Sequence, residues 1–273
     1  MAEALWDIAR PVRPGRVAGA AMAGFRDRGR TPAGLRLIPP PAVTLAVIFG
    51  TGSVAVADAA GRRQRGSVVA GLGFGTTRIT HAADFACVQV RLPPVAAGAV
   101  LGVRPGELAG FVTLDDLWGR EAARLAERLS EISSWDERFA LTDALLARRG
   151  ETGPEADREV AWAWHRMVRT RGRVRVDELA AEVGWSRKRL WSRFQAQTGL
   201  PPKRAARLVR FDDAVHRLVA GGDPARVAAD AGYADQSHLH RDVRAFTGIT
   251  PAVVAGEPFL TIDDIAWPSP PRG

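Results

Sequence analysis

The chain has 273 residues and a formal net charge of +8, from 38 basic and 30 acidic side chains. With 46% apolar residues it can bury a sizeable core, which excludes a disordered tail. Its single cysteine, Cys87, excludes an intramolecular disulfide and a cysteine-based zinc site, and one unpaired thiol suits a reducing compartment. No apolar run approaches the ~20 residues of a membrane span, so we expect a cytoplasmic protein without a membrane partner.

The N-terminal part of the chain is predicted to be a small β-rich domain over residues 1–152. Residues 1–40 are rich in Arg, Gly and Pro and show no clear period. After them, short apolar runs alternate with turn residues, which indicates strands. Gly50-Thr51-Gly52 has the composition of a hairpin turn between the first two strands. The predicted strands are 43–49, 53–57, 67–72 and 85–92.

Two helices are predicted to close this domain. The first begins at Asp115 and the second at Ser134, which has acidic residues in its first turn and basic residues in its last. Side chains at four-residue spacing mark the stripe of the first helix. They are Leu117, Glu121, Leu125 and Leu129. The expected fold class is α+β, with a barrel- or sandwich-like β domain that carries two helices, followed by an all-α domain.

Residues 153–256 are predicted to be almost entirely helical, and 257–273 to form a proline-rich C-terminal tail. Asp223-Pro224 has the composition of a capped helix start. The other predicted helices of this block are 155–171, 177–183, 186–198, 203–219 and 235–247.

An internal repeat runs through this helical block. In each copy, a small residue lets the next helix cross closely, a glycine takes the left-handed turn, and two apolar residues four apart face inward. This pattern predicts a helix-turn-helix, present twice. The first copy has Ala180, Gly184, Trp185, Leu190, Phe194, Gly199 and Pro202. The second has Ala228, Gly232, Tyr233, Leu239, Val243, Gly248 and Pro251.

The second copy carries the more specific signature. It runs Gly232-Tyr233-Ala234-Asp235-Gln236-Ser237-His238-Leu239-His240-Arg241 and closes in Gly248-Ile249-Thr250-Pro251. With the first copy, it makes residues 155–256 resemble the DNA-binding domain of AraC-type bacterial transcription regulators, in which a long helix joins two helix-turn-helix units. The resemblance implies a sequence-specific DNA-binding regulator, an activator by family habit. It also implies an N-terminal domain that senses a small molecule or mediates dimerisation.

Two residues depart from the family pattern in this second copy. Val243 stands where the family usually has Phe, and Asp242 places an acid in the second recognition helix. We expect both to leave the fold intact and to weaken docking of the second unit on DNA.

Each second helix of a unit is expected to enter the major groove and turn its outward side chains to the base edges. In the first unit these are Arg187, Lys188, Trp191, Ser192 and Gln195. In the second unit they are Gln236, Ser237, His238, His240 and Arg241. Lys203 and Arg204, at the start of the connecting helix, are better suited to phosphate, and Arg244 is a further expected DNA contact. For Arg241, a structural or phosphate contact stays open as the alternative.

Positive charge is concentrated in one part of the helical block. The 29 residues 183–211 hold eight cations and no acid, and they cover the first recognition helix and the start of the connecting helix. The second recognition helix contains Asp235 and Asp242. We therefore expect the first unit to supply most of the phosphate-driven, salt-sensitive affinity. A solvated helical face is the plainer interpretation of any such run.

A second class of function stays open: an enzyme, such as an alkyl-transfer DNA-repair protein, that uses the same DNA-binding domain. It requires a thiol in a polar, activated setting, whereas Cys87 lies in an apolar strand where core packing is expected. No catalytic residue, cofactor or metal site is predicted, since His238 and His240 lie two apart on a helix and diverge. The expected partners are double-stranded promoter or operator DNA, RNA polymerase, a small-molecule effector and a second copy of the chain.

Overall fold

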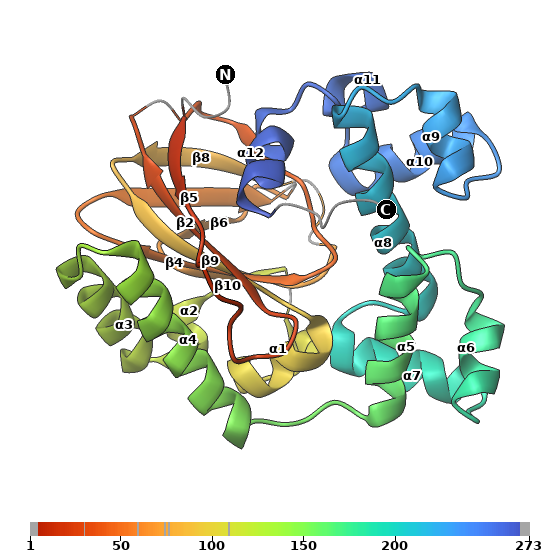
Figure 1. The fold of residues 1–273 in the computed structure, drawn as a ribbon, viewed down its shortest axis with the longest axis horizontal. Helices are drawn as coiled ribbons and strands as arrows, with labels where there is room; N and C mark the ends of the chain where they lie inside the picture. The colour runs from red at the N-terminus through yellow and green to blue at the C-terminus, as the bar shows by residue number, and fades with distance from the viewer. Residues whose placement is uncertain are drawn as a thin grey trace.

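The computed structural model describes residues 5–29, 31–58, 60–73, 75, 77–108 and 110–267. Its β-rich N-terminal part and its helical C-terminal part lie side by side (Figure 1). The strands are β1 (Trp6–Ala9), β2 (Ala21–Asp27), β3 (Leu35–Leu37), β4 (Val43–Phe49), β5 (Ser53–Asp58), β6 (Arg63–Arg65), β7 (Val68–Ala70), β8 (Thr77–Ala83), β9 (Ala86–Leu92) and β10 (Phe111–Thr113).

The strands form two sheets. One has the order β1-β2-β9-β4-β7-β10 and the other the order β3-β8-β5-β6, and paired strands run antiparallel. The sequence therefore predicted the sandwich-like class and four of the ten described strands, β4, β5, β7 and β9. It missed β1, β2 and β3 within residues 1–40, and also β6, β8 and β10. The predicted hairpin at 50–52 is wrong, because β4 pairs with β7 and β9 while β5 pairs with β6 and β8.

The six-stranded sheet is buried on both faces, and strict alternation along β9 separates the two environments. Val88, Val90 and Leu92 belong to an apolar cluster shared with the helices that cover one face. Cys87, Gln89 and Arg91 point to the other face, where they line a cavity between the two sheets. One strand thus contributes both to the core and to the wall of a cavity.

More helices accompany this domain than the two that were predicted. They are α1 (Pro94–Leu101), η2 (Pro105–Glu107), α2 (Leu114–Trp118), α3 (Arg120–Glu131) and α4 (Trp135–Thr152). The helix expected from Asp115 is broken at Gly119, whose φ of 55° lies in the left-handed region. Its cap is Thr113, whose Oγ1 accepts a hydrogen bond from the Asp116 amide. Together α1 to α4 cover the outer face of the large sheet.

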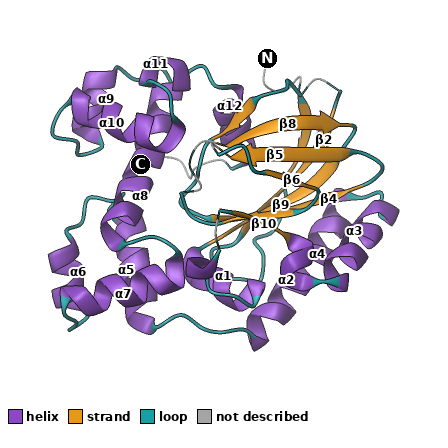
Figure 2. Ribbon diagram, turned by 180° about the vertical axis from the view of Figure 1, so that it is seen from behind, coloured by secondary structure: helices purple, strands orange, loops and turns teal. Residues whose placement is uncertain are grey.

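The C-terminal helices follow the sequence prediction to within a few residues. They are α5 (Arg158–Arg169), α6 (Val176–Glu182), α7 (Arg187–Thr198), α8 (Pro202–Val219), α9 (Pro224–Asp230), α10 (Gln236–Thr247), α11 (Pro251–Val254) and α12 (Pro258–Ala266). Two helix-turn-helix units, α6–α7 and α9–α10, lie at opposite ends of α8 (Figure 2). Gly184 and Gly232 have φ values of 68° and 77°, as the turn of each unit requires.

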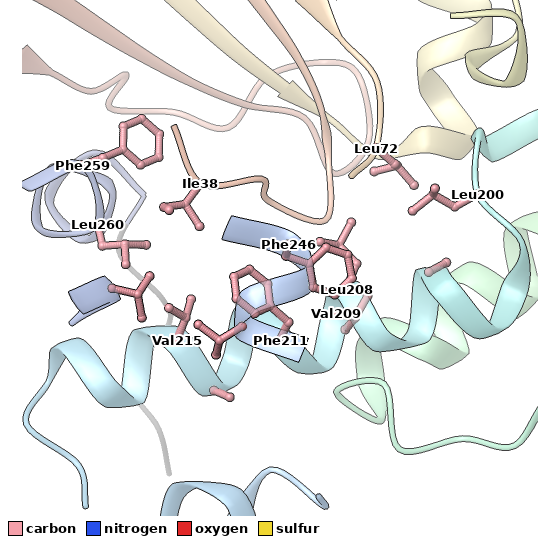
Figure 3. Close-up of a cluster of buried hydrophobic side chains, with 14 of the residues drawn as sticks. Ile38, Leu72, Leu200, Leu208, Val209, Phe211, Val215, Phe246, Phe259 and Leu260 are labelled. Carbon is pink, nitrogen blue, oxygen red and sulfur yellow. The ribbon is translucent and has the colours of Figure 1, made fainter. Parts of the chain in front are cut away.

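The prediction of a tail over 257–273 is wrong for residues 258–266, which form α12; Pro268–Gly273 lie outside the described residues. This helix leaves the C-terminal domain and packs against β1, β3 and α8. An apolar stripe explains its docking, because Phe259, Leu260 and Ile262 are all buried. Apolar contacts between the two parts continue at Ile38 and at Leu72 with Leu200 (Figure 3).

The contact of α8 with α12 predicts a pH-dependent stability. His216 Nδ1 lies 2.6 Å from Asp264 Oδ1, and its Nε2 lies 3.6 Å from Asp263 Oδ2. Burial alone would lower the pKa of His216, but Asp212, Asp263 and Asp264 outweigh it and raise that pKa from 6.5 to about 9. The stabilisation is therefore fully present below pH 6.5 and is lost as the pH rises through about 9.

We expect the free energy of unfolding to fall by up to about 3 kcal/mol across this window. Denaturant titrations at the two ends of the window measure the fall in the wild type and in His216→Gln. The variant should lose much less stability than the wild type over the same window. An equal fall in both proteins would show that His216 is not the group responsible.

Candidate nucleic-acid interface

The recognition helix of the first unit, α7, presents a polar face to solvent. Ser186 caps it by accepting a hydrogen bond from the Arg189 amide, while Leu190 and Phe194 are fully buried and fix its inner side. Four of the five predicted base-contacting side chains of this unit are exposed: Arg187, Lys188, Trp191 and Ser192. Trp191 is 52% exposed, which is unusual for so large an apolar side chain and makes it available for contact.

Gln195, the fifth predicted contact on α7, lies in a different environment. It is half-buried, and its Oε1 atom is buried without a hydrogen-bond partner among the described residues. The cause is η2 of the N-terminal domain, which packs on the end of α7 so closely that a Cβ at Gly106 would lie 2.4 Å from the Ala196 carbonyl oxygen. Gln195 is therefore not on the free face of α7 in this arrangement.

The recognition helix of the second unit, α10, has the same construction. Asp235 caps it by accepting a hydrogen bond of 2.7 Å from the His238 amide, and Leu239 and Val243 are fully buried. His238 is half-buried with its ring edge-on to Tyr233, at 5.3 Å between ring centroids. The other predicted side chains of this helix are exposed: Gln236, Ser237, His240, Arg241 and Arg244.

The structure corrects the expectation for Asp242, which does not face the DNA side of α10. It is 1% exposed and pairs with Arg207 of α8, whose Nη2 lies 2.6 Å from its Oδ1. This contact raises the pKa of the Arg207 guanidinium above its ordinary value, outweighing partial burial. Asp242 is thus a packing residue that ties α10 to α8, and it adds no negative charge to the outward face of the second unit.

A cationic hollow of about 770 Å³ lies between the two units. Six cations line it: Arg175, Arg187, Lys203, Arg207, Arg210 and Arg241. Lys203 is exposed there, and Arg204 is exposed beside it on the same turn of α8, as the phosphate prediction requires. Two acids, Asp177 and Asp242, also line the hollow, so the cations are in excess there, and an excess of positive charge attracts a polyanion.

Acids from outside the 183–211 window lie next to several of its cations. Arg187 lies 3.2 Å from Asp177, and Arg193 forms two 2.7 Å hydrogen bonds with Asp157. Arg207 pairs with Asp242. The window without acids in sequence is therefore partly neutralised in space, although exposed pairs of this kind contribute little to stability.

The described residues give no support to a metal site, a nucleophilic cysteine or a membrane-spanning helix. Within the described ranges, His, Cys, Asp and Glu side chains form no group of three or more that could hold a metal ion. Burial raises the pKa of the Cys87 thiol to about 12, so this side chain stays protonated and is a poor nucleophile. Among the same residues, no helix has the length and apolar content that crossing a membrane needs.

Comparisons with known proteins also identify a helix-turn-helix domain in the C-terminal part of the chain. Residues 179–256 match the sequence family described as a helix-turn-helix domain. None of the curated proteins matches the chain.

Two solved structures share the fold over most of the chain. Apo ToxT K231A from Vibrio cholerae strain SCE256 has a TM-score of 0.52 at 10% identity, with 90% of this chain and 99% of that chain covered. ToxT from Vibrio cholerae O395 bound to (E)-4-(8-methylnaphthalen-1-yl)but-3-enoic acid has a TM-score of 0.53 at 10% identity, with 88% and 99% covered.

The Arg207–Asp242 pair predicts a large effect on stability. Arg207→Ala leaves the Asp242 carboxylate buried without its partner and should lower the free energy of unfolding by about 2–4 kcal/mol. The lower end is expected because Arg207 is itself partly exposed. Denaturant unfolding measures the change, and Arg204→Ala, which removes an exposed cation three residues earlier on α8, is the matched control. Equal effects of the two substitutions would mean that the pair does not hold α10.

Proposed function

We propose that this chain, a DNA-binding transcription regulator with an AraC-type DNA-binding domain at its C-terminus, activates transcription by occupying two adjacent major-groove segments. The observation that carries the proposal is the pair of recognition helices α7 and α10, both exposed and both fixed to one helix, α8. With 18 residues, α8 is roughly 27 Å long. That length is comparable to the ~34 Å of one turn of DNA.

The exposed side chains, together with the half-buried His238, divide into two proposed roles. Base contacts are assigned to Arg187, Lys188, Trp191 and Ser192 on α7 and to Gln236, Ser237, His238, His240 and Arg241 on α10. Phosphate contacts are assigned to Lys203, Arg204 and Arg244. The cationic hollow lies between the two helices, where the DNA backbone would cross from one groove segment to the next. Gln195 joins the first set only if η2 moves away from α7.

The proposal predicts a footprint over two neighbouring groove segments on one face of the DNA. Sequences selected from a random DNA pool by the full chain provide the site, and hydroxyl-radical footprinting maps it. Arg187→Gln with Lys188→Gln should weaken binding more, and flatten the salt dependence more, than Arg241→Gln with Arg244→Gln. Protection of a single segment would argue against use of α10, and the reverse ranking would argue against a dominant first unit.

The cavity between the two sheets supports a second part of the proposal, control by a small molecule. It has a volume of about 100 Å³ and is lined mostly by apolar side chains, including Trp6, Phe25 and Phe85. This is smaller than the ~150 Å³ apolar cavity that binds benzene, so a larger ligand requires a lining side chain such as Phe259 to move out. Arg91 is the one charged residue among the described lining residues. We therefore assign the cavity to an apolar organic acid, the class to which the molecule bound to the similar ToxT structure belongs.

The effector assignment is tested by thermal unfolding of the full chain. The naphthyl-butenoic acid named above should raise Tm by about 5 °C or more at a hundredfold excess over its Kd, and its methyl ester should raise Tm less. Ala46→Leu, which fills the cavity lining with a larger side chain, should reduce the shift. An unchanged Tm at all concentrations of the acid would leave dimerisation as the role of the N-terminal domain.

A further inference from the structure

The helix α12 lies beyond the helix-turn-helix match, which ends at Gly256, and returns to the N-terminal sandwich. It lies between the sheets and α8 in Figure 1, and it contacts β1, β3 and α8. A helix-turn-helix unit does not require such an addition in order to bind DNA.

Two side chains of α12 reach the proposed effector cavity or its charged group. Phe259 is 8% exposed and lines the cavity, and it lies beside Ile38 in Figure 3. Asp263 is 4% exposed, and its carboxylate pairs with the guanidinium of Arg91, with Nη1 3.1 Å from Oδ2. Trp267, directly after α12, lies over the same guanidinium at 4.5 Å. The helix α12 thus supplies both the Phe259 ring in the cavity and the Asp263 carboxylate on Arg91.

We propose that α12 is a built-in competitor of the effector. Phe259 occupies part of the apolar site and Asp263 occupies the anion site on Arg91, so an apolar organic acid must displace α12 to bind both. The inference rests on the proposed effector cavity and adds the means by which that cavity is regulated. The apparent affinity for the acid is the intrinsic affinity multiplied by the fraction of molecules in which α12 is undocked.

Displacement of α12 would reach the second helix-turn-helix unit. Arg36 of β3 donates one hydrogen bond of 3.1 Å to the carbonyl of Thr247, the last residue of α10, and another of 3.1 Å to Glu257, next to α12. The end of α10 and the start of α12 are thus held by one side chain of the N-terminal domain. The first unit is held separately by η2 on α7. Release of α12 therefore loosens the second unit and leaves the first in place.

The test compares affinities for the acid in the full chain by titration calorimetry. Asp263→Asn and Phe259→Ala each weaken α12 docking and should tighten binding of the naphthyl-butenoic acid at least tenfold. Thr261→Ala, at an exposed position of the same helix, is the control and should leave the affinity unchanged. Arg91→Gln should remove the preference for the acid over its methyl ester.

Amide hydrogen exchange gives an independent measurement on the folded protein. Residues 258–266 should exchange faster in Phe259→Ala, in which the Arg91–Asp263 pair is intact, and in the wild type with acid bound. Residues of α3 and α4 should be unaffected.

Two results would overturn the proposal and are distinguishable from each other. The first result is equal affinity of the acid for wild type, Asp263→Asn and Phe259→Ala, or full protection of α12 with the acid bound. It would show that α12 does not compete with the acid, and it would not contradict the effector assignment of the cavity. No binding of the acid to any of the three proteins removes the effector assignment and the competitor with it.

Discussion

Burial of apolar side chains between the sandwich and the helical domain is the interaction on which the arrangement of the molecule depends. Ile38, Leu72, Leu200 and Phe246 come from both parts and belong to one continuous buried cluster. Because apolar burial contributes about 25 cal/mol per Å², such a cluster stabilises the docking of the two domains, beside the polar contacts that Arg36 and Arg91 make. While α12 and η2 are docked, both recognition helices take their positions from the same core.

The distribution of charge follows from that packing rather than from the order of residues along the chain. From the sequence, Asp242 was expected to weaken DNA binding by the second unit. Because α10 packs on α8, this acid is buried beside Arg207, where it stabilises the contact between the two helices and does not repel DNA. Asp157 and Asp177 are remote in sequence from the cations that they approach on α7. The outward faces of the two units are therefore more alike in charge than the sequence implies. The expected dominance of the first unit now depends on Lys188 and on the cations of the hollow.

Local signals in the sequence were sufficient for the helical domain and insufficient elsewhere, for a physical reason. Ser186, Asp223 and Asp235 cap helices through bonds to amides three residues away, and Gly184 turns the chain by its own φ, so each signal acts within one turn. The pairing of β4 with β9 joins residues about 40 positions apart, and nothing local specifies it. The burial of Gln195 and the docking of α12 depend on contacts between domains, which no periodicity encodes.

The two units differ in how they are attached to the N-terminal domain, and the difference suits them to different roles. At η2, backbone meets backbone so closely that Gly106 has no room for a Cβ, and a ligand cannot substitute for such a contact. At α12, the attachment includes one aromatic ring in the cavity, one carboxylate on Arg91 and the Arg36 hydrogen bonds, beside the buried Leu260 and Ile262. A small molecule that carries a ring and an acid group can reproduce the first two of these. Because a ligand shifts an equilibrium only by its differential affinity for the two states, the second unit is the one that such a ligand can control.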